Sequence, residues 1–229
     1  QRSMAVGARA SGLRKRKRNK TYGNVVTKRP RRLGPMRSLS VGRMYAMPRT
    51  LRTTMRYYQY AAALNPGIGG VPDQFVFSGN GLYDPNITGG GHQPAGFDEL
   101  MSFYDHFTVV ASKITVDFHN TDASNEAIVF VAVRDTNSGI GANLTGQVEN
   151  GACNVELLTK AGDSKSHTRM TMPCSVGSYL GRRDVLNDSE LKGSAVANPA
   201  EQVYFLLGAW PNSNNDSGIV GFHCVIDYD

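Results

Sequence analysis

The stretch "AIVFVAVRD", residues 127–135, is apolar at seven consecutive positions before its first charge at Arg134. Valine, isoleucine and phenylalanine favour strands. Successive side chains of a strand point to opposite faces, so a run that is apolar at every position is buried on both of them. We therefore expect residues 127–135 to form a central strand of a β-rich core.

Two other segments alternate between apolar and polar residues, as strands with one exposed face do. In "SKITVDFHN", residues 112–120, the apolar face carries Ile114, Val116 and Phe118. The opposite face carries Lys113, Thr115, Asp117 and His119. In "GIVGFHCVIDYD", residues 218–229, the apolar face carries Val220, Phe222, Cys224 and Ile226. Both segments are expected to be strands that turn one side to the core.

Five further segments complete a set of eight expected strands. They are residues 50–62, 74–79, 165–173, 176–182 and 201–210. Loops rich in Gly, Pro, Asn and Asp separate several of them, at residues 64–73, 79–96, 135–151, 183–200 and 211–217. Eight strands with long loops favour an all-β fold, a single eight-stranded jelly-roll β-sandwich, over a small barrel.

Short helices are expected at two places. Apolar residues recur at helical spacing in residues 97–104, where Phe97, Leu100, Met101 and Tyr104 share one face. The segment "NVELLTKA", residues 154–161, is a second candidate.

The first expected strand has one basic face. Leu51, Met55 and Tyr57 alternate with Arg52, Arg56 and Tyr58. A shift of one residue in register would place arginines in the core. We therefore expect the first three to face the interior and the second three to face away from it. The two arginines are then placed to contact nucleic acid, and pairing with carboxylates of a neighbouring subunit is the alternative.

The charges of the chain are divided sharply along its length. The first 56 residues hold 17 Lys or Arg and no Asp or Glu, whereas the rest hold 8 Lys or Arg and all 19 acidic residues. The first part therefore carries +17 and the remainder −11. A block of like charge cannot bury enough apolar surface to fold alone. We expect residues 1–49 to be a largely disordered or interior-facing basic arm and residues 50–229 to be the folded domain.

An arm of this composition predicts a polyanionic partner, because cations that neutralise phosphates release counterions whatever the sequence. Tyrosines at the first strand can also stack on unpaired bases, although packing within the core or between subunits explains them equally well. A merely solvated tail is the alternative for the arm. The residues expected to bind nucleic acid are Arg9, Arg14, Lys15, Arg16, Lys17, Arg18, Lys20, Lys28, Arg29, Arg31, Arg32, Arg37, Arg43, Arg49, Arg52, Arg56 and Tyr58.

Two basic clusters in the arm have the spacing of a bipartite nuclear-import signal. A nuclear import receptor is therefore an expected partner. The residues that form the clusters are Arg14, Lys15, Arg16, Lys17, Arg18, Lys28, Arg29, Arg31 and Arg32.

Histidines and carboxylates are frequent but do not fall into a metal or catalytic pattern. His92, His106 and His119 lie near Asp98, Asp105 and Asp117 in the sequence, yet no H-x-x-x-H or H-E-x-x-H spacing occurs. Neither a P-loop nor a G-x-S-x-G elbow is present. We expect no metal, no cofactor and no catalytic residue. Calcium binding between subunits by Asp227 and Asp229 is a minor alternative.

The three cysteines, Cys153, Cys174 and Cys224, have no metal-like spacing and are expected to be buried or free thiols in a reducing compartment. No apolar run approaches the length of a membrane span, so membrane insertion is not expected.

Residues 78–120, "SGNGLYDPNITGGGHQPAGFDELMSFYDHFTVVASKITVDFHN", carry a family resemblance. The motifs concerned are "LYDP" at 82–85, "GHQP" at 91–94, "GFDE" at 96–99, "YDHF" at 104–107 and "SKI" at 112–114. In these residues the chain resembles the capsid proteins of small circular Rep-encoding single-stranded DNA (CRESS) viruses, such as circoviruses. Residues 121–229 carry no motif that we can match.

The resemblance implies a structural protein, not an enzyme, which assembles as a homo-oligomer into a T=1 icosahedral shell of about 60 subunits around a single-stranded DNA genome. It also implies location in the virion and, during assembly, in the host nucleus. Three alternatives stay open: a coat protein of a single-stranded RNA or satellite virus, a cellular nucleic-acid-binding module, and an enzyme with a basic targeting tail.

Overall fold

The computed structural model describes residues 47–139, 144–213 and 218–229. The predicted arm therefore lies outside the described residues, except for residues 47–49. Residues 50–229 form the compact unit that is described below.

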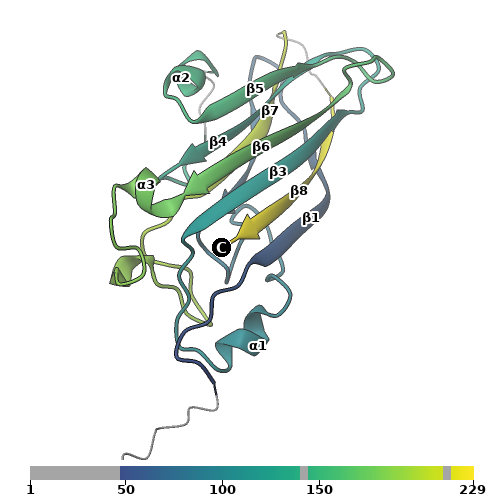
Figure 1. Cartoon of the computed structure of the whole chain (residues 1–229). Coiled ribbons are helices and arrows are strands. Elements are labelled where there is room, and N and C mark those ends of the chain that lie inside the picture. The colour runs from purple at the N-terminus through teal and green to yellow at the C-terminus, as the bar shows by residue number, and fades with distance from the viewer. Residues whose placement is uncertain (1–46, 140–143, 214–217) are drawn as a thin grey trace, which may run out of the picture. The chain divides into compact units, whose positions relative to one another are not determined.

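Eight strands in the described part of the chain form two antiparallel four-stranded sheets (Figure 1). One sheet has the order β1-β8-β3-β6, with bounds Met55–Leu64, Val220–Tyr228, Ala111–Asn120 and His167–Ser175. The other has the order β2-β7-β4-β5, with bounds Asp73–Ser78, Tyr204–Pro211, Ala127–Arg134 and Cys153–Leu158. Because β8 lies between β1 and β3 while β7 lies between β2 and β4, the strands follow the order of a jelly roll. The predicted fold class is confirmed.

The core lies between the two sheets and draws on the alternating strands that the sequence predicted. Ile114, Val116 and Phe118 of β3 are buried, as are Phe222 and Ile226 of β8. The ring of Phe222 meets Phe75 of β2 edge-on at 5.1 Å and lies 6.2 Å from Phe118, so that it joins the two sheets. The two-residue period of these strands thus leaves their other side chains on the outside.

Residues 127–134 form β4, and the prediction of a central strand there is confirmed. β4 pairs with β5 on one side and β7 on the other. Val129 and Val131 enter the core between the sheets, whereas Phe130 and Ala132 belong to a second apolar cluster. Ile87 from a loop and Leu144 from α2 (Leu144–Glu149) pack against that cluster. This sheet is therefore apolar on both faces.

Arg134, at the end of β4, is buried among neutral hydrogen-bond acceptors. Its guanidinium donates to the carbonyl oxygens of Val133, Gly151 and Gln147 and to the side chain of Gln147. Gln147 belongs to the last turn of α2 and Gly151 follows it, so the positive charge lies where the helix presents free carbonyls.

Two predicted elements were wrong. Residues 154–161 were predicted as a helix, but Cys153–Leu158 is strand β5, because pairing with β4 outweighs the helix propensity of its Glu and Leu residues. Residues 176–182 were predicted as a weak strand, but Val176–Leu180 is helix α3. Gly181 ends that helix in the left-handed conformation, at φ 68°, which glycine adopts without strain.

The predicted first strand begins later than expected. β1 starts at Met55, and Leu51 is half exposed rather than directed into the core. Tyr57 is fully buried, as predicted, and Met55 packs against the core. Leu51 lies outside the ladder with β8, whose pairing starts at Met55 and Tyr228, so no neighbouring strand fixes its direction.

Short helical segments close the remaining connections. The predicted helix at 97–104 is confirmed but shorter, as α1 (Phe97–Met101), and a 3₁₀ turn covers Ser189–Leu191. Phe97 packs edge-on against Phe107, whose ring lies over Gly193 so closely that any side chain there would collide with it. In the described residues, no helix has the length and apolar character that crossing a membrane requires.

Amide side chains clamp the loop that contains the "LYDP" motif. Asn198 accepts from the backbone N–H groups of Tyr83 and Asp84 and donates to the carbonyl of Asp84. Asn80 accepts from the N–H of Val203 and donates to the carbonyl of Glu201. These bonds satisfy loop backbone groups that the strands cannot reach.

A buried tyrosine hydroxyl connects the two sheets by a hydrogen bond to a backbone carbonyl. Tyr228 of β8 is 1% exposed, and its hydroxyl donates to the carbonyl of Ser78, at the end of β2, over 2.7 Å.

We predict that Tyr228→Phe lowers the free energy of unfolding by about 1–2 kcal/mol, because a buried carbonyl loses its donor. The single tryptophan, Trp210, is buried and reports unfolding in guanidinium by its fluorescence. Tyr58→Phe is the control, since Tyr58 is exposed on the same sheet; equal midpoints for the two variants at one protein concentration would contradict the prediction.

Candidate nucleic-acid interface

Most residues predicted to bind nucleic acid, including both import clusters, lie outside the described residues. The structure describes Arg49, Arg52, Arg56 and Tyr58. Arg56 and Tyr58 of β1 have exposed side chains, as predicted for a strand face that points away from the core. Arg52 is also exposed, but it lies before β1, where Leu51 is exposed as well. The role of these arginines and of Tyr58 in binding nucleic acid stays a prediction.

Arg52, just before β1, and Arg56, within it, pair with two aspartates of the same chain, Asp229 just after β8 and Asp227 within it. Arg52 donates to Asp229 over 2.5 Å and 3.3 Å, and Arg56 donates to Asp227 over 2.6 Å. Lys113 of β3 lies 3.8 Å from the second oxygen of Asp227. Asp227 therefore lies between two cations from neighbouring strands, because Arg56, Asp227 and Lys113 share one row of the sheet. The sequence offered carboxylates of a neighbouring subunit as partners and missed these two, which come from the chain itself.

The hydrogen bonds in these pairs stabilise the charged forms of Arg52, Arg56 and Asp229. The hydrogen bond from Arg52 lowers the pKa of Asp229, and the hydrogen bonds to Asp229 and Asp227 raise the pKa values of Arg52 and Arg56. The Arg52–Asp229 pair therefore stabilises the folded chain at pH values above the usual pKa of an aspartate. This stabilisation is lost as the pH falls through the lowered pKa of Asp229. Because the groups are exposed, solvent screens the pairs and their contribution to stability is small.

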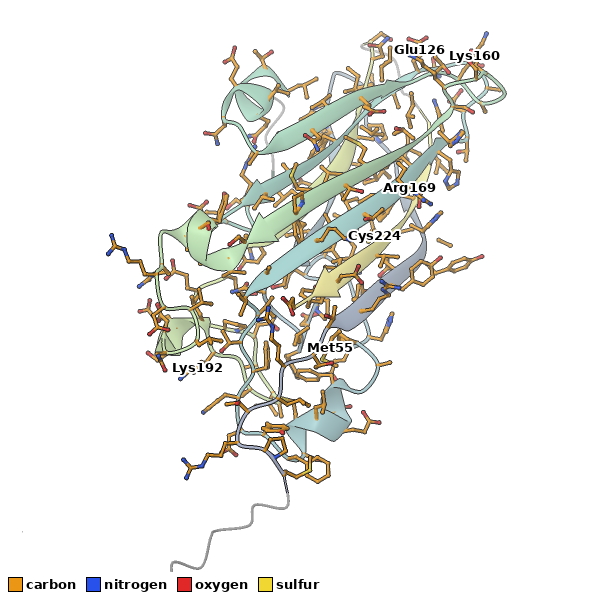
Figure 2. All side chains as sticks on the ribbon, viewed as in Figure 1. Met55, Glu126, Lys160, Arg169, Lys192 and Cys224 are labelled. Atoms are coloured by element: carbon orange, nitrogen blue, oxygen red, sulfur yellow. The ribbon has the colours of Figure 1, made fainter. Side chains whose placement is uncertain are left out.

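A second charged row crosses the same sheet, four residues along β3 from Lys113. Arg169 of β6 donates to both oxygens of Asp117 of β3, over 2.6 Å and 2.9 Å. His223 of β8 lies 3.2 Å from the same carboxylate through Nε2. Figure 2 labels Arg169 on this sheet, together with Met55 at the start of β1. The sequence predicted the outward direction of Asp117, but not the partners that strand pairing brings to it.

A row of uncharged side chains separates the two charged rows. Its members, in order across the four strands, are Tyr58, Val225, Thr115 and Thr171. The hydroxyls of the two threonines lie 3.3 Å apart. Tyr58 is 42% exposed, and the centre of its ring lies 6.3 Å from those of both Tyr60 and His223. We call these three rows the outer face of the β1-β8-β3-β6 sheet.

The residues with metal-binding chemistry are dispersed. His92, His106 and His119 are all exposed, and His92 stacks on Tyr57 at 4.8 Å. Asp227 and Asp229, the candidates for calcium, face arginine and lysine instead. Among residues 47–139, 144–213 and 218–229, no group of three or more His, Cys, Asp or Glu side chains could hold a metal ion.

Comparison with known proteins gives structural likeness only. No protein-family model and no curated protein matches the chain. A solved structure of Sacbrood virus of honeybee matches at 14% identity and a TM-score of 0.41, covering 100% of this chain and 88% of that one. One of Turnip yellow mosaic virus matches at 11% and 0.37, covering 81% and 85%. One of rhinovirus-B5 matches at 10% and 0.38, covering 87% and 86%. These TM-scores are low, so the likenesses carry no argument about function.

The three cysteines are all free, and they differ in accessibility. Burial raises the pKa of Cys174 to about 11 and that of Cys224 to about 12. Cys153, on edge strand β5, is only partly buried, and burial raises its pKa as well. Because the thiolate is the reactive form, none of the three is activated.

We predict that a maleimide at about pH 8 modifies Cys153 first and reaches Cys174 and Cys224 only after unfolding. Mass spectrometry of peptides from a time course in native buffer and in guanidinium measures the order. Modification of Cys224 in native buffer as fast as that of Cys153 would contradict the difference in burial between them.

Proposed function

We propose that this chain is the coat subunit of a small virus and that it packages a single-stranded nucleic-acid genome through its basic arm. The observation that carries the proposal is the division of charge, with +17 in the first 56 residues and −11 in the remainder. A dense cationic block attached to a domain of net negative charge concentrates the binding of a polyanion in the arm.

The size of the block fits a genome. A shell of about 60 subunits would carry on the order of 10³ arm cations, which is within a small factor of the phosphates of a few kilobases of single strand. Binding by charge alone also needs no particular sequence, which a coat requires if it is to cover a whole genome.

The fold and the motif region support the same proposal. A jelly roll of two four-stranded sheets is an architecture that viral coat domains use. The resemblance of residues 78–120 to CRESS virus capsid proteins favours single-stranded DNA as the cargo and a T=1 shell. The arm neutralises the phosphates of DNA and RNA alike, so a single-stranded RNA or satellite virus coat is the alternative.

For this function we predict that the purified full chain forms particles about 200 Å wide that protect nucleic acid. Electron microscopy measures the particles. Extraction after nuclease treatment, followed by separate DNase and RNase digestion, identifies the cargo as DNA or RNA. A chain that stays monomeric at all concentrations would favour a cellular nucleic-acid-binding module instead.

A matched variant tests the arm within that experiment. Replacing the ten Lys and Arg residues between Arg14 and Arg32 by Gln alters no residue of the folded domain. We expect particles or subunits that retain far less nucleic acid at about 0.2 M salt, because the cations that neutralise phosphates are lost. Unchanged retention would show that the arm is not the binding element.

The two basic clusters lead us to propose nuclear import as a second role of the arm. We predict that residues 1–40 direct a fused reporter to the nucleus and that changing Lys28, Arg29, Arg31 and Arg32 to Ala weakens this. The control changes Arg2, Arg9, Lys20 and Arg37 to Ala, which removes the same charge outside both clusters. Import reads a spaced motif whereas phosphate binding sums charge. Equal effects of the two variants on reporter location would therefore contradict a specific signal.

A further inference from the structure

The outer face of the β1-β8-β3-β6 sheet presents its cations above its carboxylates. The side chains of Arg56 and Lys113 are 69% and 52% exposed, whereas that of Asp227 between them is 20% exposed. In the second charged row, Arg169 is 70% exposed and Asp117 is 26% exposed. A ligand that approaches this face from solvent therefore meets guanidinium and ammonium groups first.

The carboxylates bind these cations in the way a phosphate would. Arg169 donates to both oxygens of Asp117, and two parallel hydrogen bonds from arginine are also its preferred contact with phosphate. Asp227 presents one oxygen to Arg56 and the other to Lys113. The cations of these pairs are exposed to solvent, which screens their attraction to the carboxylates, so a phosphodiester can compete with the carboxylates for them.

The middle row is suited to a base. Tyr58 is exposed at its end, and aromatic rings bind unpaired bases by stacking without strong sequence preference. Val225, Thr115 and Thr171 continue the row with short side chains. Side chains on one face recur at about 6.7 Å along a strand, so the two charged rows lie about 13 Å apart. One extended single strand that crosses the sheet can contact both of them.

We propose that this outer face is a second binding site for single-stranded nucleic acid, in which Arg56, Lys113 and Arg169 contact phosphates and Tyr58 stacks on a base. Asp227 and Asp117 pair with these cations until the sugar–phosphate backbone of the nucleic acid displaces them. The inference rests on the proposed function, since it needs a packaged single strand, and it adds Lys113, Arg169 and the two resident carboxylates to the binding residues. The other occupant that the face could take is an acidic surface of a neighbouring subunit.

Photocrosslinking of the full chain separates this site from the arm. The probe is a single-stranded oligonucleotide with bromodeoxyuridine at several positions, and mass spectrometry maps the crosslinked peptides. We expect crosslinks both within residues 1–46 and at Tyr58. Crosslinks in the arm alone would overturn the inference and leave the proposed function standing, whereas no crosslinks anywhere would count against both.

Removing a resident carboxylate gives the sharper test, because the expected effect is a gain. In the full chain, Asp227→Asn frees Arg56 and Lys113, and Asp117→Asn frees Arg169. Each variant should bind a labelled oligonucleotide several-fold more tightly in fluorescence anisotropy at about 0.2 M salt. The slope of log affinity against log salt should steepen by about 0.7 for each further phosphate that the variant neutralises.

The matched control is Glu149→Gln, which removes one negative charge from exposed helix α2, beside β5. An equal gain in oligonucleotide affinity in this variant would show that the gain comes from net charge alone, and it would contradict the proposed site. If Asp227→Asn and Asp117→Asn change assembly but leave oligonucleotide affinity unaltered, the face is a subunit contact and the inference is wrong.

The stacking contact is tested by Tyr58→Ala, which should weaken binding about fivefold or more without changing the salt slope. Tyr83→Ala is its control, because Tyr83 is similarly exposed at 39% but lies in the loop between β2 and α1. Equal affinities for the two variants would remove Tyr58 from the site.

Discussion

The two-residue period of the strands in the β1-β8-β3-β6 sheet is the constraint on which the rest of the structure depends. Phe118 and Phe222 can enter the core only if Asp117 and His223 point out of it, and the same holds for Tyr57 and Arg56. A slip of one residue between any two strands would bury charges that now lie in water. The packing of the aromatic core thus fixes the register, and the register fixes which charges meet on the outer face.

The two sheets use this constraint differently. β4 is apolar on both faces, and Ile87 and Leu144 pack against its second cluster, so that side of the sandwich is covered by the chain's own loop and helix. The other sheet carries arginine, lysine, aspartate and histidine on its outer side. The rows of paired arginine, lysine and aspartate that could bind a partner by charge lie on this second sheet. In the sequence, the acid-free segment precedes β1, one strand of that sheet.

The sequence predicts elements well where a periodic pattern and burial agree. β3, β4 and β8 were predicted with the correct faces because their apolar residues recur at every position or at every second one. β5 was missed because it is an edge strand with a mostly exposed pattern, and its Glu and Leu residues favour a helix until β4 pairs with it. Helix α3 was missed because the only sign of it in the sequence is Gly181, which follows its last residue. A glycine at that position can end a helix or a strand, so it does not show which of the two precedes it.

The candidate site was predictable only in part, because its charges meet through strand pairing. The outward direction of Arg56 and of Asp117 follows from alternation within each segment. The contact of Arg56 with Asp227, 171 residues away, can be predicted only if it is known that β8 lies between β1 and β3.

The pairing of cations with carboxylates also has a physical consequence that the positions of the cations alone do not reveal. A face of unpaired arginines and lysines would repel itself before any polyanion arrived. Each of the three cations instead contacts a carboxylate set lower in the sheet, with Asp227 shared by Arg56 and Lys113, and the guanidinium groups still lie outermost. The same surface is therefore compatible with folding alone and with binding phosphate afterwards.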